Sequence, residues 1–402
     1  MKKQEIQINR KNIVLRVILF LFFLTVGVTF IALYFTGVLQ FQKGYSKIEI
    51  IPENQNIKAD KIVYYSYFDG NSLSVRQNVK NLQGFYSPKA NYVLMLTDEY
   101  ANYESRNNLK TIADNEGKEV EVDEVLYKIL QDAYTKSKEE KNYSLLGYKL
   151  FLQWDVIIGL DGLSLINSDP SVNPETKALL ENQVQVIKEE SKREFLSFRH
   201  KDEKFFVKAS FTSEYKNILD DNDPLLSLGI LKDAYIIDYL ASQLEREGNK
   251  DGFLISSDGY IKALSEYQGG SYNLYDIYDD KISQVGSIVI NKNESHCRYA
   301  FFDYYKSMYY SINGQIRYPL VNMKDGMASS FGNAFSMKGT DLLETSYNLL
   351  NFISLPRDEA ISLADKKEYN NLIFFEGEKK VTTINADEKN YKIISSYQIE
   401  KH

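Results

Sequence analysis

The sequence has very little cysteine and histidine, and this excludes several kinds of site. Among its 402 residues there is one cysteine and there are three histidines. The single cysteine, Cys297, excludes a disulfide within the chain and any zinc site built from cysteine thiolates. Chemistry that needs several imidazole groups is also disfavoured, because only His200, His296 and the terminal His402 supply them. Carboxylates and hydroxyls must therefore provide most of the ligands of any metal.

The sequence also lacks the excess of positive charge and the glycine-rich loops that mark common classes of nucleotide-binding protein. Its 48 Lys and Arg residues are outnumbered by 55 Asp and Glu residues, and the formal net charge is -7. Nucleic acid is not an expected partner, because its recognition relies on a basic surface. Neither a G-x-G-x-x-G run nor a P-loop lysine pattern occurs in the sequence.

The N-terminal region contains one long apolar run. Residues 17–42 carry no charge, and about 20 apolar residues suffice to cross a bilayer. Basic residues precede this run and predict a cytoplasmic N-terminus, with the rest of the chain outside the cell membrane: Lys2, Lys3, Arg10, Lys11 and Arg16. A cleaved signal peptide is the alternative, but the run is long and no small-residue cleavage site is evident.

The predicted organisation therefore has four parts. A cytoplasmic tail spans residues 1–12, a transmembrane helix residues 13–36, and a polar tether residues 37–59. One folded extracytoplasmic domain then covers residues 60–402, because no linker or internal repeat interrupts it.

The centre of that domain is a predicted helix followed by two strands. One stripe of apolar residues recurs at spacings of four, three, four and three: Ile230, Ala234, Ile237, Ala241 and Leu244. This spacing indicates a helix that packs on a core, and it lies between Asp223-Pro224 and Gly248. Residues 253–255 and 260–264 read as strands joined by a turn at 256–259.

Other elements complete a mixed pattern. Helices are predicted at 125–138, 170–192, 340–352 and 356–364. Strands are predicted at 61–67, 92–96 and 372–375, near 288 and 309, and twice within 195–212. The predicted fold class is a single mixed α+β domain behind the transmembrane helix.

Asp341 and Thr345 form a candidate metal site. They stand four residues apart at the start of a predicted helix, so both side chains leave the same face. A carboxylate and a hydroxyl are ligands that suit Mg²⁺. The alternative is structural: Asp341 with Glu344 three residues later is a capping-box pattern, and acidic residues in a first turn favour the helix dipole.

The histidines and the cysteine offer no catalytic pair. His296 and Cys297 are adjacent on a predicted strand, where neighbouring side chains point to opposite faces, so they cannot form a Cys–His dyad. His200 lies in a charged turn, and we assign it no chemistry.

Several motifs in sequence order resemble the ApbE family of FAD:protein FMN transferases. Residues 227–238 read S-L-G-I-L-K-D-A-Y-I-I-D where the family has D-L-G-G-I-A-K-G-Y-A-V-D. Residues 255–261, I-S-S-D-G-Y-I, correspond to V-N-L-G-G-D-I, and residues 340–345, T-D-L-L-E-T, to A-D-A-L-x-T. Residues 313–326 keep the spacing of D-G-x-x-Y-x-H-I-I-D-P-x-T-G. The resemblance covers roughly residues 60–385.

The resemblance carries expectations about fold and function. Proteins of this family are exported or membrane-anchored, have a mixed α/β fold, bind FAD with Mg²⁺, and move FMN onto a Thr or Ser of an acceptor protein. It implies three metal ligands and three contacts to the dinucleotide: Asp341, Thr345 and the backbone carbonyl of Ile230 for Mg²⁺, and Ser227, Asp233 and Gly259 for FAD.

The chain departs from the family at positions that matter for catalysis. Ser227 replaces a flavin-contacting Asp, and Asp233 stands where relatives carry Lys or Glu. Pro319 replaces the family's His, and Asn322 its Asp, so an imidazole that could accept a proton from an acceptor hydroxyl is missing. Two functions stay open: a membrane-anchored flavin transferase, and a catalytically inactive relative that binds flavin or a protein partner.

Overall fold

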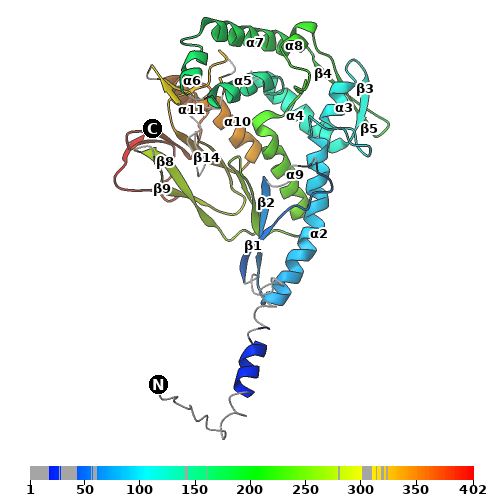
Figure 1. Cartoon of the computed structure of the whole chain (residues 1–402), viewed down its shortest axis with the longest axis vertical. Helices are drawn as coiled ribbons and strands as arrows, with labels where there is room; N and C mark the ends of the chain where they lie inside the picture. The colour runs from blue at the N-terminus through cyan, green and yellow to red at the C-terminus, as the bar shows by residue number, and fades with distance from the viewer. Residues whose placement is uncertain are drawn as a thin grey trace, which may run out of the picture.

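The computed structural model covers most of the chain after residue 43. The described residues are 18–26, 28, 43–55, 57, 61–140, 144–160, 162–278, 281–300, 310–313, 315–317, 321–322 and 325–402. A nine-stranded sheet forms the centre of the described fold, with helices on one face and a three-stranded sheet on the other (Figure 1). The predicted mixed α+β class is confirmed.

Neighbouring strands of the large sheet are antiparallel except for the last pair, which is parallel. Their order is β1 (Gly44–Ile48), β2 (Ile62–Phe68), β6 (Gly252–Ser256), β7 (Tyr260–Ala263), β10 (Ser295–Ala300), β14 (Ala334–Gly339), β15 (Leu372–Gly377), β16 (Lys380–Ile384) and β18 (Gln398–Lys401). The predicted strands at 61–67, 253–255, 260–264 and 372–375 all belong to this sheet.

Three smaller sheets surround it. The sheet that packs on the second face consists of β8 (Gly270–Tyr278), β9 (Lys281–Ile290) and β17 (Tyr391–Ile393). The other two consist of β3 (Glu119–Val122), β4 (Leu196–Lys201) and β5 (Lys204–Ala209), and of β11 (Tyr310–Ile312), β12 (Gln315–Arg317) and β13 (Ser329–Ser330).

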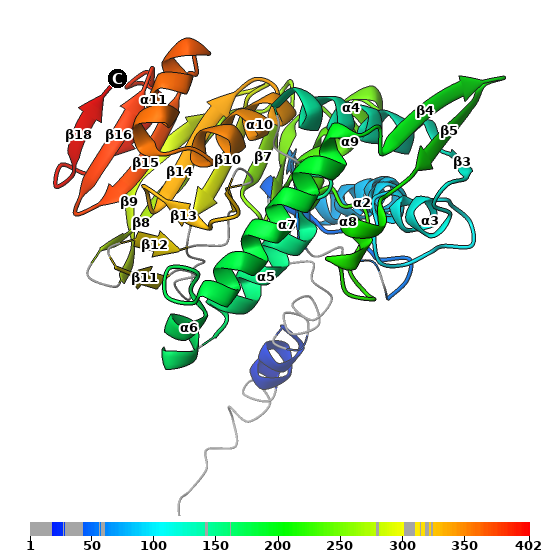
Figure 2. The same cartoon turned by 90° about the horizontal axis from the view of Figure 1, so that it is seen from above.

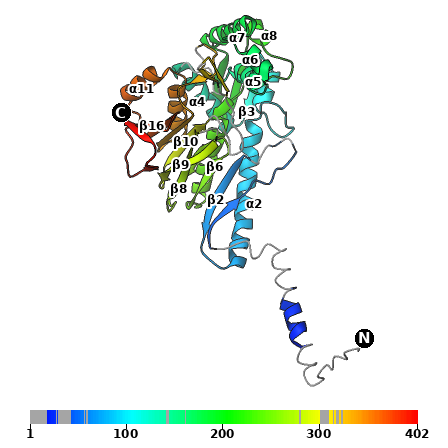
Figure 3. The same cartoon turned by 60° about the vertical axis from the view of Figure 1, so that its left-hand side comes forward.

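The helices gather mainly on one face of the large sheet. In chain order they are α2 (Ser72–Leu96), α3 (Leu109–Asp114), α4 (Glu124–Glu140), α5 (Tyr148–Ile158), α6 (Gly162–Ser168), α7 (Pro174–Lys192), α8 (Ser213–Asn217), the short 3-10 helix η3 (Gly229–Leu231), α9 (Lys232–Arg246), α10 (Leu342–Ile353) and α11 (Arg357–Lys366). Figure 2 shows α10 and α11 beside β14, β15 and β16, and Figure 3 shows α2 alongside β2. Helix α9 packs on β6 and β7. Apolar side chains of α2, α9 and α10 fill the larger core.

The central helix follows its predicted stripe. Ala234, Ile237, Ala241 and Leu244 are buried in α9. The helix begins later than expected, at Lys232, because the residues before it form η3. Its position against β6 and β7 brings the start of α9 next to the β6–β7 turn.

The predicted strand at 92–96 is wrong, because these residues form the last turn of α2. A short apolar run cannot be assigned to helix or strand by itself. The buried residues of the whole helix recur at helical spacing instead: Val75, Val79, Leu82, Tyr86, Ala90 and Val93. Viewed over 25 residues, the run at 92–96 is the end of that stripe.

The described residues include only part of the predicted N-terminal tail, transmembrane helix and tether. Residues 18–26 and 28 are helical (Figure 1). The apolar side chains of residues 18–24 and of Val28 are exposed. Within the described part of the chain, no helix is long and apolar enough to cross a membrane. The tail 1–12 and most of the predicted span 13–36 lie outside the described residues. The predicted tether 37–59 contains β1, which pairs with β2, so that part belongs to the folded sheet.

Candidate functional site

Four of the predicted site residues lie in two adjacent segments, residues 227–233 and 256–260, which we call the turn region. Ser227 is buried, its hydroxyl accepts the Gly229 N–H at 3.0 Å, and its own N–H donates to the Leu145 carbonyl at 3.2 Å. Gly229 has φ +56, in the left-handed region that favours glycine. The serine that replaces the family's aspartate therefore stabilises a turn of the backbone.

The Ile230 carbonyl, a predicted metal ligand, has a partner within the chain. It accepts a hydrogen bond from the Tyr260 hydroxyl at 2.6 Å. The Tyr260 and Tyr299 hydroxyls lie 2.8 Å apart, and both rings are buried. A carbonyl oxygen has two lone pairs, so this bond leaves one for a second donor or a cation.

Asp233 is buried in the first turn of α9. The Ser256 hydroxyl donates to its carboxylate, and the Asp258 N–H donates to the same hydroxyl oxygen at 3.0 Å. Burial raises the pKa of Asp233, and the negative charge of Asp258 raises it further, while the bond from Ser256 acts in the opposite direction. A carboxylate thus occupies the helix N-terminus, where an anionic ligand would otherwise be favoured.

Gly259 allows the β6–β7 turn to approach β10. It has φ +100, and a Cβ atom there would lie 2.2 Å from the Arg298 carbonyl oxygen. The Gly259 carbonyl accepts the Arg298 N–H at 3.0 Å. The close approach made possible by this glycine is to a neighbouring strand, and any larger residue would push the two strands apart.

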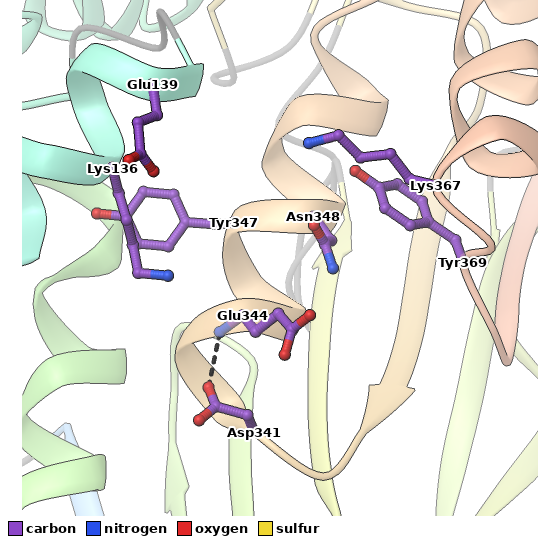
Figure 4. Close-up of a pocket in the computed structure, with 8 residues that line it drawn as sticks. All are labelled: Lys136, Glu139, Asp341, Glu344, Tyr347, Asn348, Lys367 and Tyr369. Atoms are coloured by element: carbon purple, nitrogen blue, oxygen red, sulfur yellow. Dashed lines mark hydrogen bonds between the residues drawn. The ribbon is translucent and has the colours of Figure 1, made fainter.

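Asp341 lies at a cavity of about 420 Å³ between α4, the start of α10 and the α11–β15 connection. We call this cavity the α10 pocket. Figure 4 shows Tyr347 pointing from α10 toward α4, with Glu344 and Asn348 on the side that faces Lys367 and Tyr369. Eight residues line it: Lys136, Glu139, Asp341, Glu344, Tyr347, Asn348, Lys367 and Tyr369.

The two predicted ligands on α10 point in different directions. Asp341 is the N-cap of the helix, as the structural alternative predicts, and its Oδ1 accepts the Glu344 N–H at 2.8 Å. The Thr345 hydroxyl donates to the Asp341 carbonyl at 2.5 Å and lies against Gly339 of β14. Asp341 lines the α10 pocket, while Thr345 is buried and is not among its lining residues.

Two charged residues that do not line the α10 pocket, Asp238 and Lys262, lie close to it. Burial raises the pKa of Asp238 on α9; Lys262 opposes this effect, and the negative charges of Asp341 and Asp132 add to it. The Lys262 ammonium donates to the carbonyl of Thr340, directly before Asp341, at 2.8 Å. The charges of Asp132 on α4 and of Asp341 at the start of α10 thus both act on the Asp238 carboxyl, and Lys262 opposes them.

A chain of hydroxyl groups joins the pocket to α4. Tyr347 and Tyr235 have their hydroxyls 3.0 Å apart, and Tyr235 donates to Asp132 at 2.6 Å. The Lys136 ammonium lies 5.2 Å from the centroid of the Tyr347 ring. Asp132, Lys136 and Tyr347 are not among the residues that the sequence predicted for a site, and Tyr235 appears there only as part of the 227–238 motif. The signal available was helical spacing: positions 341, 344 and 348 share one face of α10, and positions 132 and 136 share one face of α4.

The donor atoms present suit a hard cation, although they are not gathered into a cluster of carboxylates. Across the described residues, no group of three or more His, Cys, Asp or Glu side chains could hold a metal ion. A site for Mg²⁺ would depend on Asp341 with the hydroxyl of Thr345 and the carbonyl of Ile230, all oxygen ligands that this ion accepts. The Thr345 hydroxyl keeps its lone pairs when it donates its hydrogen. The metal ligands stay a prediction.

His296 does not replace the missing family histidine. Its Nε2 lies 2.7 Å from the Ser336 hydroxyl in the interior of the sheet, and burial lowers the pKa of His296 to about 3. Burial raises the pKa of the neighbouring Cys297 thiol to about 12. With these pKa values, neither His296 nor Cys297 changes its protonation state near neutral pH. Pro319 lies outside the described residues.

Comparisons with known proteins identify the fold. No family model and no curated protein matches the sequence. The ApbE protein of Thermotoga maritima matches with a TM-score of 0.55 and 12% identity, over 82% of this chain and 94% of that one. The flavin transferase ApbE of Vibrio cholerae matches with a TM-score of 0.54 and 9% identity, over 89% and 98%. The flavinyl transferase ApbE of Pseudomonas stutzeri matches with a TM-score of 0.50 and 11% identity, over 83% and 92%.

Proposed function

We propose that this chain, which has the fold of the ApbE flavin transferases, binds FAD and transfers its FMN part to a Thr or Ser of a partner protein. The fold covers 82–89% of the chain, which is the first support for this proposal. The main observation in support of a metal and cofactor site here is the position of Asp341. Its carboxylate lies at the N-terminus of α10 and lines the open, charged α10 pocket.

The residues divide the work as follows. Asp341, Thr345 and the Ile230 carbonyl would hold Mg²⁺, which supplies charge neutralisation at the FAD diphosphate. Lys136 brings an ammonium group to the α10 pocket, which Asp341 also lines, and there it can pair with a phosphate oxygen. The transfer joins the acceptor oxygen to the FMN phosphorus and breaks the bond from that phosphorus to the oxygen of AMP; AMP leaves with the bonding electrons, and the hydroxyl proton of the acceptor passes to solvent.

We also propose that the N-terminal segment anchors the protein in the cell membrane with the folded domain outside. The support is the uncharged run at 17–42 behind a basic N-terminus. The exposed apolar side chains of residues 18–24 suit contact with lipid. Protease treatment of intact cells tests this topology, because only an outward-facing domain would be cut before lysis.

The transferase proposal is tested by a mass measurement on the acceptor. Full-length protein in detergent is mixed with FAD, Mg²⁺ and a candidate acceptor, and the acceptor is examined for added FMN on Thr or Ser. The Vibrio cholerae flavin transferase, run in parallel with the same acceptor, is the positive control. Absence of the adduct where the control enzyme produces it contradicts the proposal.

A second function has specific observations in its favour: a catalytically inactive protein that binds flavin or a protein partner. The Ile230 carbonyl already accepts the Tyr260 hydroxyl, and Asp233 places a buried carboxylate in the first turn of α9. His296 is buried with a pKa of about 3. Calorimetry separates the versions: binding of FAD without transfer supports a flavin-binding protein, and absence of both FAD and Mg²⁺ binding leaves only the protein-binding version.

A further inference from the structure

The loop that leads into the turn region is tied to the start of α5 by one lysine. The Lys149 ammonium donates to Asp220 Oδ2 at 2.6 Å and to Asp223 Oδ2 at 2.8 Å. The Asp220 N–H also donates to Asp223 Oδ2 at 2.9 Å. One ammonium group thus closes the loop onto itself and onto a helix more than 70 residues earlier in the chain.

Hydrogen bonds to backbone carbonyls continue this connection up to the candidate cofactor residues. The Tyr215 hydroxyl lies 3.3 Å from the Leu146 carbonyl and 3.1 Å from the Leu225 carbonyl. The Leu145 carbonyl accepts the Ser227 N–H. Segments 145–149 and 215–227 therefore lie side by side. The ion pairs of Lys149 with Asp220 and Asp223 link them just before the turn region begins at residue 227.

Burial shows which contact the loop depends on. The side chain of Lys149 is 10% exposed and that of Asp223 is 8% exposed, whereas that of Asp220 is 81% exposed. An exposed ion pair contributes little, but a buried carboxylate that loses its cation is strongly destabilising. The Lys149–Asp223 pair is therefore the contact whose loss would release the loop.

We infer that Lys149 is a positioning residue for the turn region. Through Asp223 and Asp220 it fixes the path of residues 219–229, and so the orientation of Ser227 and of the Ile230 carbonyl. The inference rests on the proposed function only in taking the turn region as the place of cofactor contact. The role of Lys149 in fixing the loop is supported by the hydrogen bonds within this chain alone.

The test compares Lys149→Met with a matched control, Lys338→Met. Lys338 is also a buried lysine, 3% exposed, and it pairs with Glu294 at 3.0 Å on β14, away from this loop. In full-length protein, hydrogen exchange at the Ser227 and Gly229 amides should become about tenfold faster or more in K149M, because local opening sets the exchange rate. In K338M it should stay at the parent rate. FAD affinity, read from fluorescence quenching, should weaken about tenfold in K149M only.

A double variant separates positioning from simple stability. Lys149→Met with Asp223→Asn removes the stranded carboxylate, so the melting temperature should recover while exchange at Ser227 and Gly229 stays fast. Recovery of both together, or equal exchange in K149M and K338M, overturns the inference. If the parent protein binds no FAD, the proposed function fails, and the exchange measurements still decide the role of Lys149.

Discussion

The turn region and the α10 pocket hold their predicted site residues in opposite ways. In the turn region, Ser227, Ile230 and Asp233 each have a hydrogen-bond partner within the chain; Ser227 and Asp233 are buried and Ile230 is half-buried. In the α10 pocket, charged side chains from three segments surround an open cavity. In the turn region the polar groups already have hydrogen-bond partners within the chain, so a ligand must share or displace these bonds. The α10 pocket is open to a ligand, but its charged side chains have few contacts that would fix the position of that ligand.

Helix α9 and strand β7 connect the two regions. On α9, Asp233 of the turn region lies five residues before Asp238, whose carboxyl is affected by the charge of Asp341 in the α10 pocket. Tyr260 and Lys262 lie two apart on β7; the first contacts Ile230 and the second contacts Thr340. Side chains two residues apart on a strand share a face and stand about 7 Å apart. The regions are therefore neighbours, and the following changes test how differently they behave.

The largest expected effect is loss of transfer when the charge of Asp341 is removed. Asp341→Asn keeps an N-cap side chain, so the stability of α10 should change little. Loss of a carboxylate ligand should lower Mg²⁺-dependent FMN transfer about a hundredfold or more. Adduct formation is followed by mass spectrometry and stability by melting temperature. Glu344→Gln, which alters the same pocket without touching the predicted ligands, should have a much smaller effect, and equal losses in both variants would refute the special role of Asp341.

The next largest effect is on folding, at Gly259 in the turn region. Gly259→Ala should cost about 2–4 kcal/mol, because the strain of a positive φ adds to the overlap with the Arg298 carbonyl. Gly248→Ala is the matched control, with φ +80 and nothing within 4 Å of the added Cβ, and should cost about 1 kcal/mol. Urea denaturation measures both. Similar costs would mean that the turn tolerates movement away from β10.

Tyr260→Phe tests whether the turn region is closed by its own hydrogen bond. The change removes the donor to the Ile230 carbonyl and should cost about 1–2 kcal/mol without metal. Added Mg²⁺ should recover part of this loss, because the released carbonyl becomes available to a cation. Tyr299→Phe leaves that bond in place and should show no such recovery. If Mg²⁺ affects the two variants equally, the Ile230 carbonyl is not a ligand.

Much of this arrangement could be read from the sequence where the pattern is local. The stripe from Ala234 to Leu244 predicted α9, and the order of motifs predicted the fold. The spacing of Asp341 and Thr345 placed both at the start of one helix, but could not show that the hydroxyl turns toward Gly339. The orientation of the Thr345 hydroxyl depends on how α10 packs on β14. This packing is a tertiary contact, and the spacing of residues within one helix does not predict it.

Contacts between distant segments were out of reach of the sequence for the same reason. Lys149 lies 71 residues from Asp220 and reads in isolation as one more charged residue of an amphipathic helix. Lys136 and Tyr347 meet across two helices that lie about half the chain apart. Local periodicity predicts which face of each helix is buried, but not which faces meet.

The smallest expected effect is a change in the pH dependence of stability at Asp238. Burial and the charges of Asp341 and Asp132, opposed by Lys262, raise the pKa of this carboxyl in the folded protein. Between the unfolded and folded pKa values the native state binds more protons, so stability falls as pH rises through that range. Asp238→Asn should therefore match the parent in acid and become more stable than the parent as pH increases. Urea denaturation across pH 3–7 measures the difference. A constant gap between the two curves would show that Asp238 is as well solvated as an exposed carboxylate, and that the open character of the α10 pocket extends to the surface of α9.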